Sequence, residues 1–219
     1  MKIFLDTANL EAIAKANETG LIDGVTTNPT KILETGKPFK EVICEICAIV
    51  EGPVSAEAVA ESAVDIVREA EHIAALASNV AIKVPMTPEG LKACKKLREK
   101  NIIVNITMVF SPDQALLAMK AGTSFVSIVL SRLDKIGGDP YQLVEDTVTI
   151  KKKYNFQSEI LAASIKTRDA VIHCMRSGCD IISIPDPLFF DLFNHPLTDS
   201  GLSGFEKDWG KLIDAGLVR

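Results

Sequence analysis

The sequence predicts an α/β fold: a single-domain, closed (β/α)8 barrel of parallel strands, known as a TIM barrel. Short runs of β-branched residues alternate with longer helical patterns from end to end, roughly eight times. No linker, low-complexity tract or change of composition divides the 219 residues. An open, doubly wound sheet usually has a glycine-rich loop after its first strand. Here the first strand ends in Leu5-Asp6-Thr7-Ala8-Asn9, which contains no glycine. We therefore expect one barrel domain over residues 1–219, with a C-terminal helical tail.

Eight short runs are expected to form the strands, because they are mainly apolar and are bounded by turn residues. The runs are Lys2–Asp6, Gly24–Thr27, Val54–Glu57, Val80–Val84, Ile102–Ile106, Phe125–Val129, Glu159–Ala163 and Ile181–Ile184. This count is the one expected of a closed barrel.

Three turns carry the signal for a helix that starts after a strand. Thr87, Ser111 and Asp139 each place a capping side chain before a proline at the first helical position. Gln114 and Gln142 stand three residues after the last two caps, which predicts a capping box in both helices.

Glycines and the end of the chain give two further expectations. Gly122 and Gly178 are expected to end helices before the next strand. The tail Phe205–Arg219 has apolar residues at roughly helical spacing, so we expect it to pack on a neighbouring copy or to cover its own barrel.

Composition indicates a globular protein and limits the classes of partner. With 47% hydrophobic and 24% charged residues, the chain can bury a full core. The formal net charge of −5 argues against a nucleic-acid surface, so a phosphate-bearing ligand needs a local cluster of cations. The sequence shows neither a signal-peptide pattern nor an apolar stretch long enough to cross a membrane, and we expect no membrane partner.

The five cysteines form an odd set, which indicates a reducing compartment, and we expect a cytoplasmic protein. Cys44 and Cys47 form a C-x-x-C, but they lie in the helical pattern Phe39–Glu51, and no second pair or histidine follows at metal spacing. We expect both to be buried in packing roles, and we expect no metal site.

Lys83 is the most informative single residue. It interrupts the apolar run Val80–Pro85, a predicted buried strand in which an ammonium group is costly. Burial disfavours the charged form of an amine, and a neutral lysine in a dry pocket can attack a ketone to give a carbinolamine and then a Schiff base. The alternative is a lysine at a strand end that reaches solvent or pairs with a carboxylate.

Polar residues fall at or just past the ends of successive predicted strands, and those ends form the active-site face of a barrel. Amines, carboxylates and amides suit the cleavage of a carbon–carbon bond beside a masked ketone, because they form the imine, move protons and orient hydroxyls. Each residue alone has an ordinary alternative as a cap, a turn residue or a backbone partner. The residues are Asp6, Asn28, Glu57, Lys83, Asn105, Thr107, Ser127 and Ser164.

Cations beside two of these strand ends suggest a phosphate site. Arg132 lies in the loop predicted after the sixth strand, while Ser164 and Lys166 follow the seventh. Two cations beside hydroxyls can clamp a terminal phosphate, and a solvated surface position is the alternative for each of them.

Motifs spread over essentially the whole chain add a resemblance. They are Phe4-Leu5-Asp6-Thr7-Ala8, Gly24-Val25-Thr26-Thr27-Asn28-Pro29-Thr30, Lys83-Val84-Pro85, Asn105-Ile106-Thr107, Ala162-Ala163-Ser164, His195–Leu202 and Phe205–Trp209. Together they resemble the small transaldolase-like family, which includes transaldolases and fructose-6-phosphate aldolases.

The resemblance implies transfer of a dihydroxyacetone unit from a ketose phosphate, sedoheptulose 7-phosphate or fructose 6-phosphate, to an aldose phosphate. It implies that Lys83 forms the Schiff base, that Asp6 accepts the hydroxyl proton, and that Glu57 moves protons at the carbinolamine. A water near Thr107 would assist that last step. The implied contacts to substrate hydroxyls are Asn28, Asn105 and Ser127, and those to phosphate are Arg132, Ser164 and Lys166. No cofactor is implied, because the imine itself accepts the electrons.

Two positions bear on the branch of the family. At the position of Glu57, transaldolases resemble one another in having a glutamate, whereas the aldolases tend to have a glutamine. Glu57 therefore favours a transaldolase of the pentose phosphate pathway. The segment Ser127–Arg132 departs from the family, because Val129 is neither the phenylalanine typical of transaldolases nor the tyrosine typical of the aldolases. The alternatives are a fructose-6-phosphate aldolase and a sugar-phosphate binding protein without catalysis. The resemblance also implies a homo-oligomer, a pentamer or a decamer.

Overall fold

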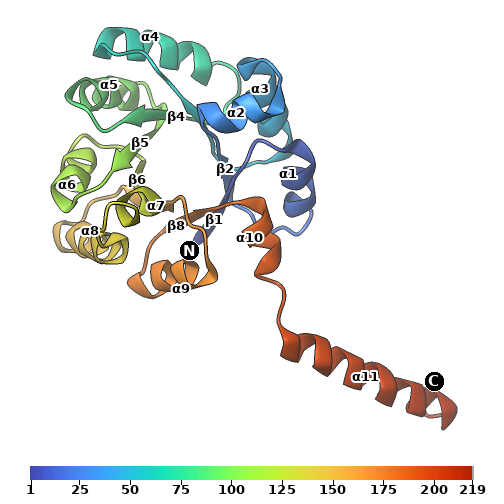
Figure 1. Ribbon diagram of the computed structural model, residues 1–219. Coiled ribbons are helices and arrows are strands. Elements are labelled where there is room, and N and C mark those ends of the chain that lie inside the picture. Colours follow the sequence, from blue (N-terminus) through green and yellow to red (C-terminus); the bar gives the residue numbers. More distant parts are fainter. Residues whose placement is uncertain (219) are drawn as a thin grey trace.

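Eight parallel strands close into a barrel with helices around it (Figure 1), which confirms the predicted fold class. The structure is a computed structural model that describes residues 1–218, and Arg219 lies outside the described residues. Each strand pairs with the next, and β1 also pairs with β8. The strands are β1 (Lys2–Asp6), β2 (Gly24–Thr26), β3 (Val54–Glu57), β4 (Val80–Pro85), β5 (Ile103–Val109), β6 (Phe125–Val129), β7 (Glu159–Ala163) and β8 (Ile181–Ile184).

Helices follow every strand, and the short helices after β2 and β6 contribute residues to the barrel mouth. The helices are α1 (Leu10–Asn17), α2 (Pro29–Thr35), α3 (Phe39–Ile49), α4 (Ala63–Ala74), α5 (Pro88–Glu99), α6 (Pro112–Lys120), α7 (Leu130–Asp134), α8 (Pro140–Tyr154), α9 (Arg168–Ser177), α10 (Asp186–Asp191) and α11 (Pro196–Asp214). The assignment of residues 1–219 to a single domain stays a prediction.

Five strands have the predicted bounds, and the largest difference concerns β5. The predicted end at Ile106 is wrong, because the strand continues to Val109 past a shift of register in its pairing with β6. Met108, inside this irregularity, has a left-handed backbone with φ of 64°. A bulge of this kind inserts a residue without ending the strand, and an apolar pattern does not reveal it.

The predicted helix caps form, but the capping boxes do not. Thr87, Ser111 and Asp139 each accept a hydrogen bond from a backbone N–H of their own helix. Gln114 accepts from the N–H of Phe110, one residue before the cap, and Gln142 donates to Asp146. Gly178 caps α9 in a left-handed conformation, and Gly122 follows α6 in the same conformation, as predicted.

The inside of the barrel changes from apolar to polar along the strands. Its lower part is filled by a buried apolar cluster of Phe4, Ala81, Phe125, Leu161 and Ile181. Because strand side chains alternate in direction, the next inward position lies two residues further on. These next positions include Asp6, Lys83, Ser127 and Ser183, which line the mouth. The fold therefore places a polar layer directly above a dry floor.

Helix α11 extends away from the barrel (Figure 1), and none of its residues is buried. Phe205, Trp209 and Ile213 are each more than half exposed. The tail therefore does not cover its own barrel, which was one of the two predicted arrangements. None of the helices in residues 1–218 combines the length and the apolar character that a membrane span needs.

The prediction that Cys44 is buried is wrong, and Cys47 is only partly buried. The residues of α3 that face the core are Val42, Ile43 and Ile46, so Cys44 falls on the outer side of the helix. The other three cysteines are buried, and burial raises the pKa of the Cys174 thiol to about 12.

Candidate active site

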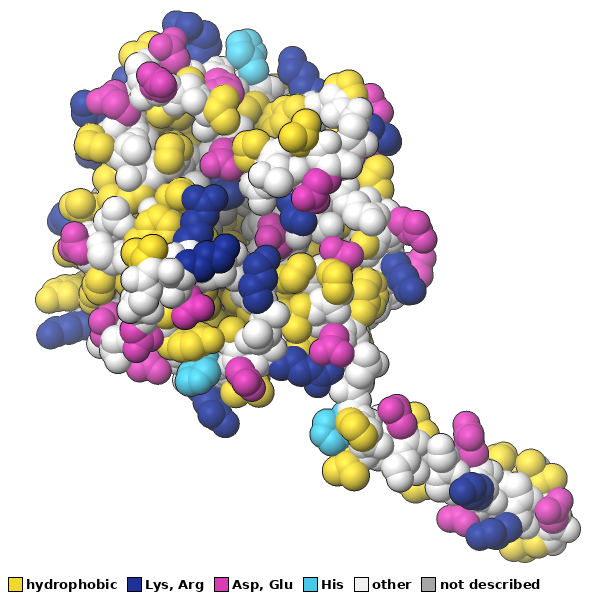
Figure 2. Space-filling view, viewed as in Figure 1, with side chains coloured by type: hydrophobic (Ala, Val, Ile, Leu, Met, Phe, Trp, Pro, Cys, Tyr) yellow, Lys and Arg dark blue, Asp and Glu magenta, His cyan; other side chains and the backbone are white. Residues whose placement is uncertain are grey.

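A cavity of about 790 Å³ opens at the carboxyl ends of the strands. Figure 2 looks onto this face and shows Lys and Arg side chains gathered around the hollow at its centre. The side chains predicted for catalysis or substrate binding all line it. They are Asp6, Asn28, Glu57, Lys83, Asn105, Thr107, Ser127, Arg132, Ser164 and Lys166.

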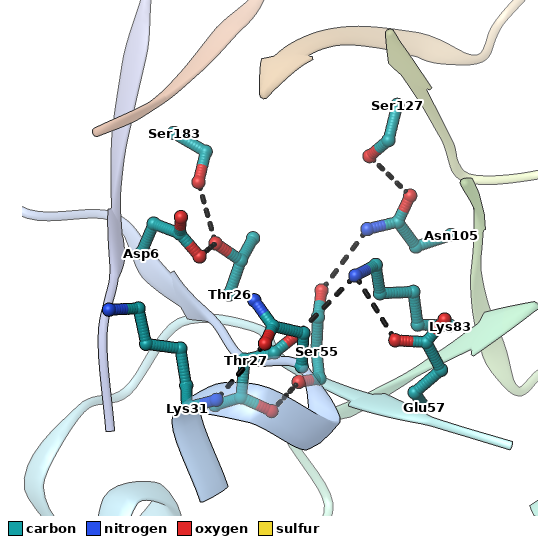
Figure 3. A network of polar contacts seen from close by, with 11 residues as sticks. Asp6, Thr26, Thr27, Lys31, Ser55, Glu57, Lys83, Asn105, Ser127 and Ser183 are labelled. Carbon is teal, nitrogen blue, oxygen red and sulfur yellow. Dashed lines mark hydrogen bonds and ion pairs between the residues drawn. The ribbon is translucent and has the colours of Figure 1, made fainter. Parts of the chain in front are cut away.

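Lys83 and Glu57 form an ion pair at the cavity wall. They occupy paired positions on β4 and β3, so both side chains point inward, and Lys83 Nζ lies 3.3 Å from Glu57 Oε2 (Figure 3). Their side chains are only 15% and 20% exposed, and Nζ also donates to the carbonyl of Thr27 at 3.4 Å. Of the two ordinary alternatives, the structure shows the pairing with a carboxylate rather than a lysine in open water. A carboxylate at this distance can accept the ammonium proton and leave a free amine.

Asp6 lies at the end of β1 and faces the same cavity (Figure 3). Burial raises the pKa of Asp6 above its ordinary value, while the charges of Lys83, Lys166 and Lys31 and a hydrogen bond from Thr26 oppose that rise. The Thr26 hydroxyl donates to Asp6 Oδ1 at 3.3 Å. A carboxylate in such a dry, cationic setting is suited to accept a proton from a substrate hydroxyl and to return it.

The amide of Asn105 is held in one orientation by hydroxyls on both sides. Ser127 Oγ donates to its Oδ1 at 2.7 Å, and its Nδ2 donates to Ser55 Oγ at 3.2 Å (Figure 3). Asn105 is fully buried, so the two contacts fix which edge of the amide meets a ligand. Thr107 follows two residues later on β5 and is also buried beside the cavity.

Asn28 both caps helix α2 and lines the cavity. Its Oδ1 caps α2 by accepting the N–H of Lys31 at 3.0 Å, and the residue lines the cavity. Because the carbonyl oxygen is engaged by the helix, the NH₂ group is the part of this side chain suited to contact a ligand.

The predicted phosphate residues come together on one side of the mouth. Arg132 belongs to the short helix α7 rather than to a loop, because residues after β6 turn directly into that helix. Ser131 Oγ and Ser164 Oγ lie 2.6 Å apart, and Ser164 has a left-handed backbone with φ of 60°. Lys166 stands two residues further along the same loop. Cations beside hydroxyls are the groups that bind phosphate oxygens.

Val129 lies at the rim between these groups. It is the last residue of β6, pairs with Ala163 of β7, and both line the cavity. Valine at this position presents a smaller side chain to the cavity than the aromatic residues typical of the family.

Several polar side chains of the candidate site were missed by the sequence reasoning. Thr26, Ser55 and Ser183 lie inside predicted strands, and their hydroxyls contact Asp6, Asn105 and Thr26, respectively. Counting inward positions in steps of two would have found them, because each lies on the same strand face as a residue of the site or the apolar floor. Lys31 gives no comparable signal, because it sits in a helix outside the barrel.

Within residues 1–218 we find no group of three or more His, Cys, Asp or Glu side chains placed to hold a metal ion. The cavity offers the Lys83 amine, three carboxylates, an amide held by hydroxyls and several cations to a polar, anionic ligand.

The family model described as transaldolase/fructose-6-phosphate aldolase matches residues 3–216. A protein of Aquifex aeolicus named probable transaldolase is 51% identical over 212 residues, which cover 97% of this chain and 98% of that protein. A protein of the same name from Streptococcus equi subsp. equi is 50% identical over 209 residues, covering 95% and 98%. A third, from Cereibacter sphaeroides, is 48% identical over 219 residues, the full length of both chains.

The matched range spans nearly the whole barrel and contains all the positions that line its mouth. The chain is therefore an enzyme that belongs to the transaldolase/fructose-6-phosphate aldolase family.

Proposed function

We propose that this protein is a transaldolase that transfers a dihydroxyacetone unit from sedoheptulose 7-phosphate or fructose 6-phosphate to an aldose phosphate through a Schiff base on Lys83. We assign it to the pentose phosphate pathway in the cytoplasm. One observation carries the proposal: the Lys83 amine lies 3.3 Å from the Glu57 carboxylate, in a cavity that Asp6 also lines.

The first half of the reaction uses the pair of Lys83 and Glu57. Glu57 takes a proton from the ammonium, and the free amine attacks the ketone carbon of the substrate to form a carbinolamine. Glu57 then returns the proton to the leaving hydroxyl, assisted by a water beside Thr107, and an iminium forms. Water leaves and no net proton is consumed.

The second half uses Asp6. Its carboxylate takes the proton from the substrate hydroxyl on the carbon beyond the scissile bond, the carbon–carbon bond breaks, and its electron pair enters the iminium to give an enamine. The aldehyde departs. An acceptor aldehyde then takes the reverse path, and hydrolysis frees Lys83. We assign Asn28, Asn105 and Ser127 to the hydroxyls of the dihydroxyacetone unit.

Arg132, Ser164 and Lys166 bind the terminal phosphate in this proposal, and they are gathered on one side of the mouth. Donor and acceptor both carry a phosphate, so one site serves each in turn.

Reductive trapping tests the Schiff base. The protein is incubated with fructose 6-phosphate and borohydride, which reduces an imine to a stable secondary amine, and peptides are mapped by mass spectrometry. We expect one adduct, on Lys83, and none in Lys83→Met. The variant Lys92→Met, which changes an exposed lysine on α5, is the control and should be labelled as in the wild type. Absence of an adduct on Lys83 would favour a binding protein without catalysis.

Dependence on the acceptor separates a transaldolase from an aldolase. In a transaldolase an aldehyde captures the enamine, whereas in an aldolase a proton quenches it. We expect product from fructose 6-phosphate only when erythrose 4-phosphate is present. Product that forms equally without the acceptor would refute the transaldolase and favour the aldolase.

We also propose a homo-oligomer, a pentamer or a decamer, because α11 exposes a row of apolar side chains that lacks a partner within residues 1–218. Sedimentation of the full chain should give five or ten times the 23.7 kDa of one copy. Trp209→Glu places a charge on the apolar side of α11 and is expected to dissociate the assembly. A monomeric wild-type protein would refute this part of the proposal.

A further inference from the structure

Lys31 reaches the cavity from outside the barrel. It lies in the first turn of α2, its backbone N–H is held by the Asn28 cap, and its side chain rises towards Asp6 (Figure 3). The side chain lines the cavity together with Glu34, and the two form an ion pair of 3.3 Å one helical turn apart. Lys31 is 31% exposed, so its ammonium stands between the cavity and water.

The charges around Asp6 come from several elements. Three lysines act on its carboxylate: Lys83 from β4, Lys166 from the loop after β7, and Lys31 from α2. The acidic groups that line the same cavity are Glu57 on β3, beside Lys83, and Glu34 on α2, beside Lys31. Thr26 and Ser183 of the adjacent strands contribute only hydroxyls, and these are hydrogen-bonded to each other.

Two of these three positive charges do not act on Asp6 throughout the proposed reaction. Lys83 has to give up its proton before it attacks the ketone, so its positive charge is absent until the iminium forms. Lys166 faces the phosphate, whose negative charge offsets its own. Burial alone drives Asp6 towards its protonated form, in which it cannot accept a proton from substrate.

We propose that Lys31 is a positioning residue that keeps the Asp6 carboxylate ionised during carbinolamine formation, when Lys83 is neutral and Lys166 is bound to phosphate. Asp6 then enters the cleavage step, in which the iminium on Lys83 is again positive, as the carboxylate that can accept the substrate proton. Glu34 moderates this effect, because it competes with Asp6 for the ammonium of Lys31. The inference rests on the proposed function for its meaning in catalysis, but the electrostatic coupling between Lys31 and Asp6 can be measured without any reaction.

The direct test measures the titration of Asp6 in the full chain carrying Lys83→Met, which removes the competing amine and stops catalysis. Difference infrared spectra report the C=O band of the protonated carboxyl, and the loss of this band in Lys83→Met with Asp6→Asn assigns it. We expect Lys31→Met to move the midpoint to higher pH by at least about 0.3 units, a twofold change in the ratio of ionised to protonated carboxyl. Glu34→Gln is expected to move it to lower pH.

Two further variants control this test. Lys31→Arg keeps the charge and should titrate as the parent does. Lys92→Met breaks an equivalent ion pair with Glu89 on α5 and should leave Asp6 unchanged. A midpoint unchanged in Lys31→Met, or moved equally by Lys92→Met, overturns the proposal. Circular dichroism of each variant excludes a loss of fold as the cause.

With Lys83 intact, the acid limb of kcat provides the second readout, because it reports groups of the enzyme–substrate complex. Lys31→Met should move this limb to higher pH, and Lys31→Arg should restore it. A limb that stays in place overturns the role of Lys31 in catalysis. If trapping shows no adduct on Lys83, the proposed function fails, while the infrared titration still decides whether Lys31 acts on Asp6.

Discussion

Ser127→Ala separates the orientation of the Asn105 amide, a proposed substrate contact, from the stability of the barrel. Ser127 is 1% exposed, and its hydroxyl donates to Asn105 Oδ1 at 2.7 Å. Removing it leaves a buried carbonyl oxygen without this donor, which costs about 1–2 kcal/mol of unfolding free energy. For a protein of this size, that lowers Tm by roughly 2–8 °C.

Ser158→Ala is the matched control. Ser158 is also buried, and its hydroxyl donates at 2.7 Å to the carbonyl of Thr123 at the opposite end of the barrel. The lost bond has the same length and the same kind of acceptor, so the stability cost is expected to be similar. The acceptor there is a backbone carbonyl, which cannot rotate, and it lies outside the cavity.

Only Ser127→Ala leaves a side-chain amide, that of Asn105, free to rotate. If the Asn105 amide rotates, it presents the wrong edge to the substrate and loses one hydrogen bond in the transition state. One such bond is worth about 1.4–2.7 kcal/mol, or 10- to 100-fold in kcat/KM. Urea unfolding and transaldolase kinetics should therefore show two variants of similar stability with different activity. Equal activity of Ser127→Ala and Ser158→Ala would refute this reasoning.

Three further predictions follow from single contacts. Glu57→Gln is expected to slow borohydride trapping by roughly 10²–10⁴-fold, because a placed proton donor is lost; an unchanged rate would assign that proton to another group. Asp6→Asn should raise Tm at neutral pH, because burial raises the pKa of Asp6 and its carboxylate is unfavourable in the fold. The folded state binds the proton of the Asp6 carboxyl more tightly than the unfolded chain does. The destabilisation of the fold by ionised Asp6 is therefore absent below the ordinary pKa of aspartate and complete above the raised pKa. The Tm difference should therefore shrink as pH falls through that interval, and a constant difference would contradict the assignment. Gly52→Ala should lower the free energy of unfolding in urea by roughly 3 kcal/mol or more, because a Cβ would overlap the carbonyl oxygen of Asp23. Wild-type stability of this variant would show that the backbone around Gly52 can shift to make room.

Much of the fold follows from local pattern. Strands such as β1, β3 and β6 have the predicted bounds because their ends coincide with a change from apolar residues to turn and capping residues. The end of β5 was wrong because the bulge at Met108 changes pairing without changing composition. Cys44 was misplaced for a related reason, since a small apolar residue gives little information about which side of a helix faces the core.

The sequence by itself determined the barrel, the polar positions at its strand ends and the presence of a lysine in a buried strand. These properties depend on the alternation of side chains along a strand and on residues adjacent in the sequence, and both can be read from the linear chain. Only the tertiary structure decided which side chains meet: the ion pair of Lys83 with Glu57, the hydroxyls on Asn105 and the approach of Lys31 to Asp6. Such distances arise when the eight strands close in one register and bring residues far apart in the chain to a single mouth.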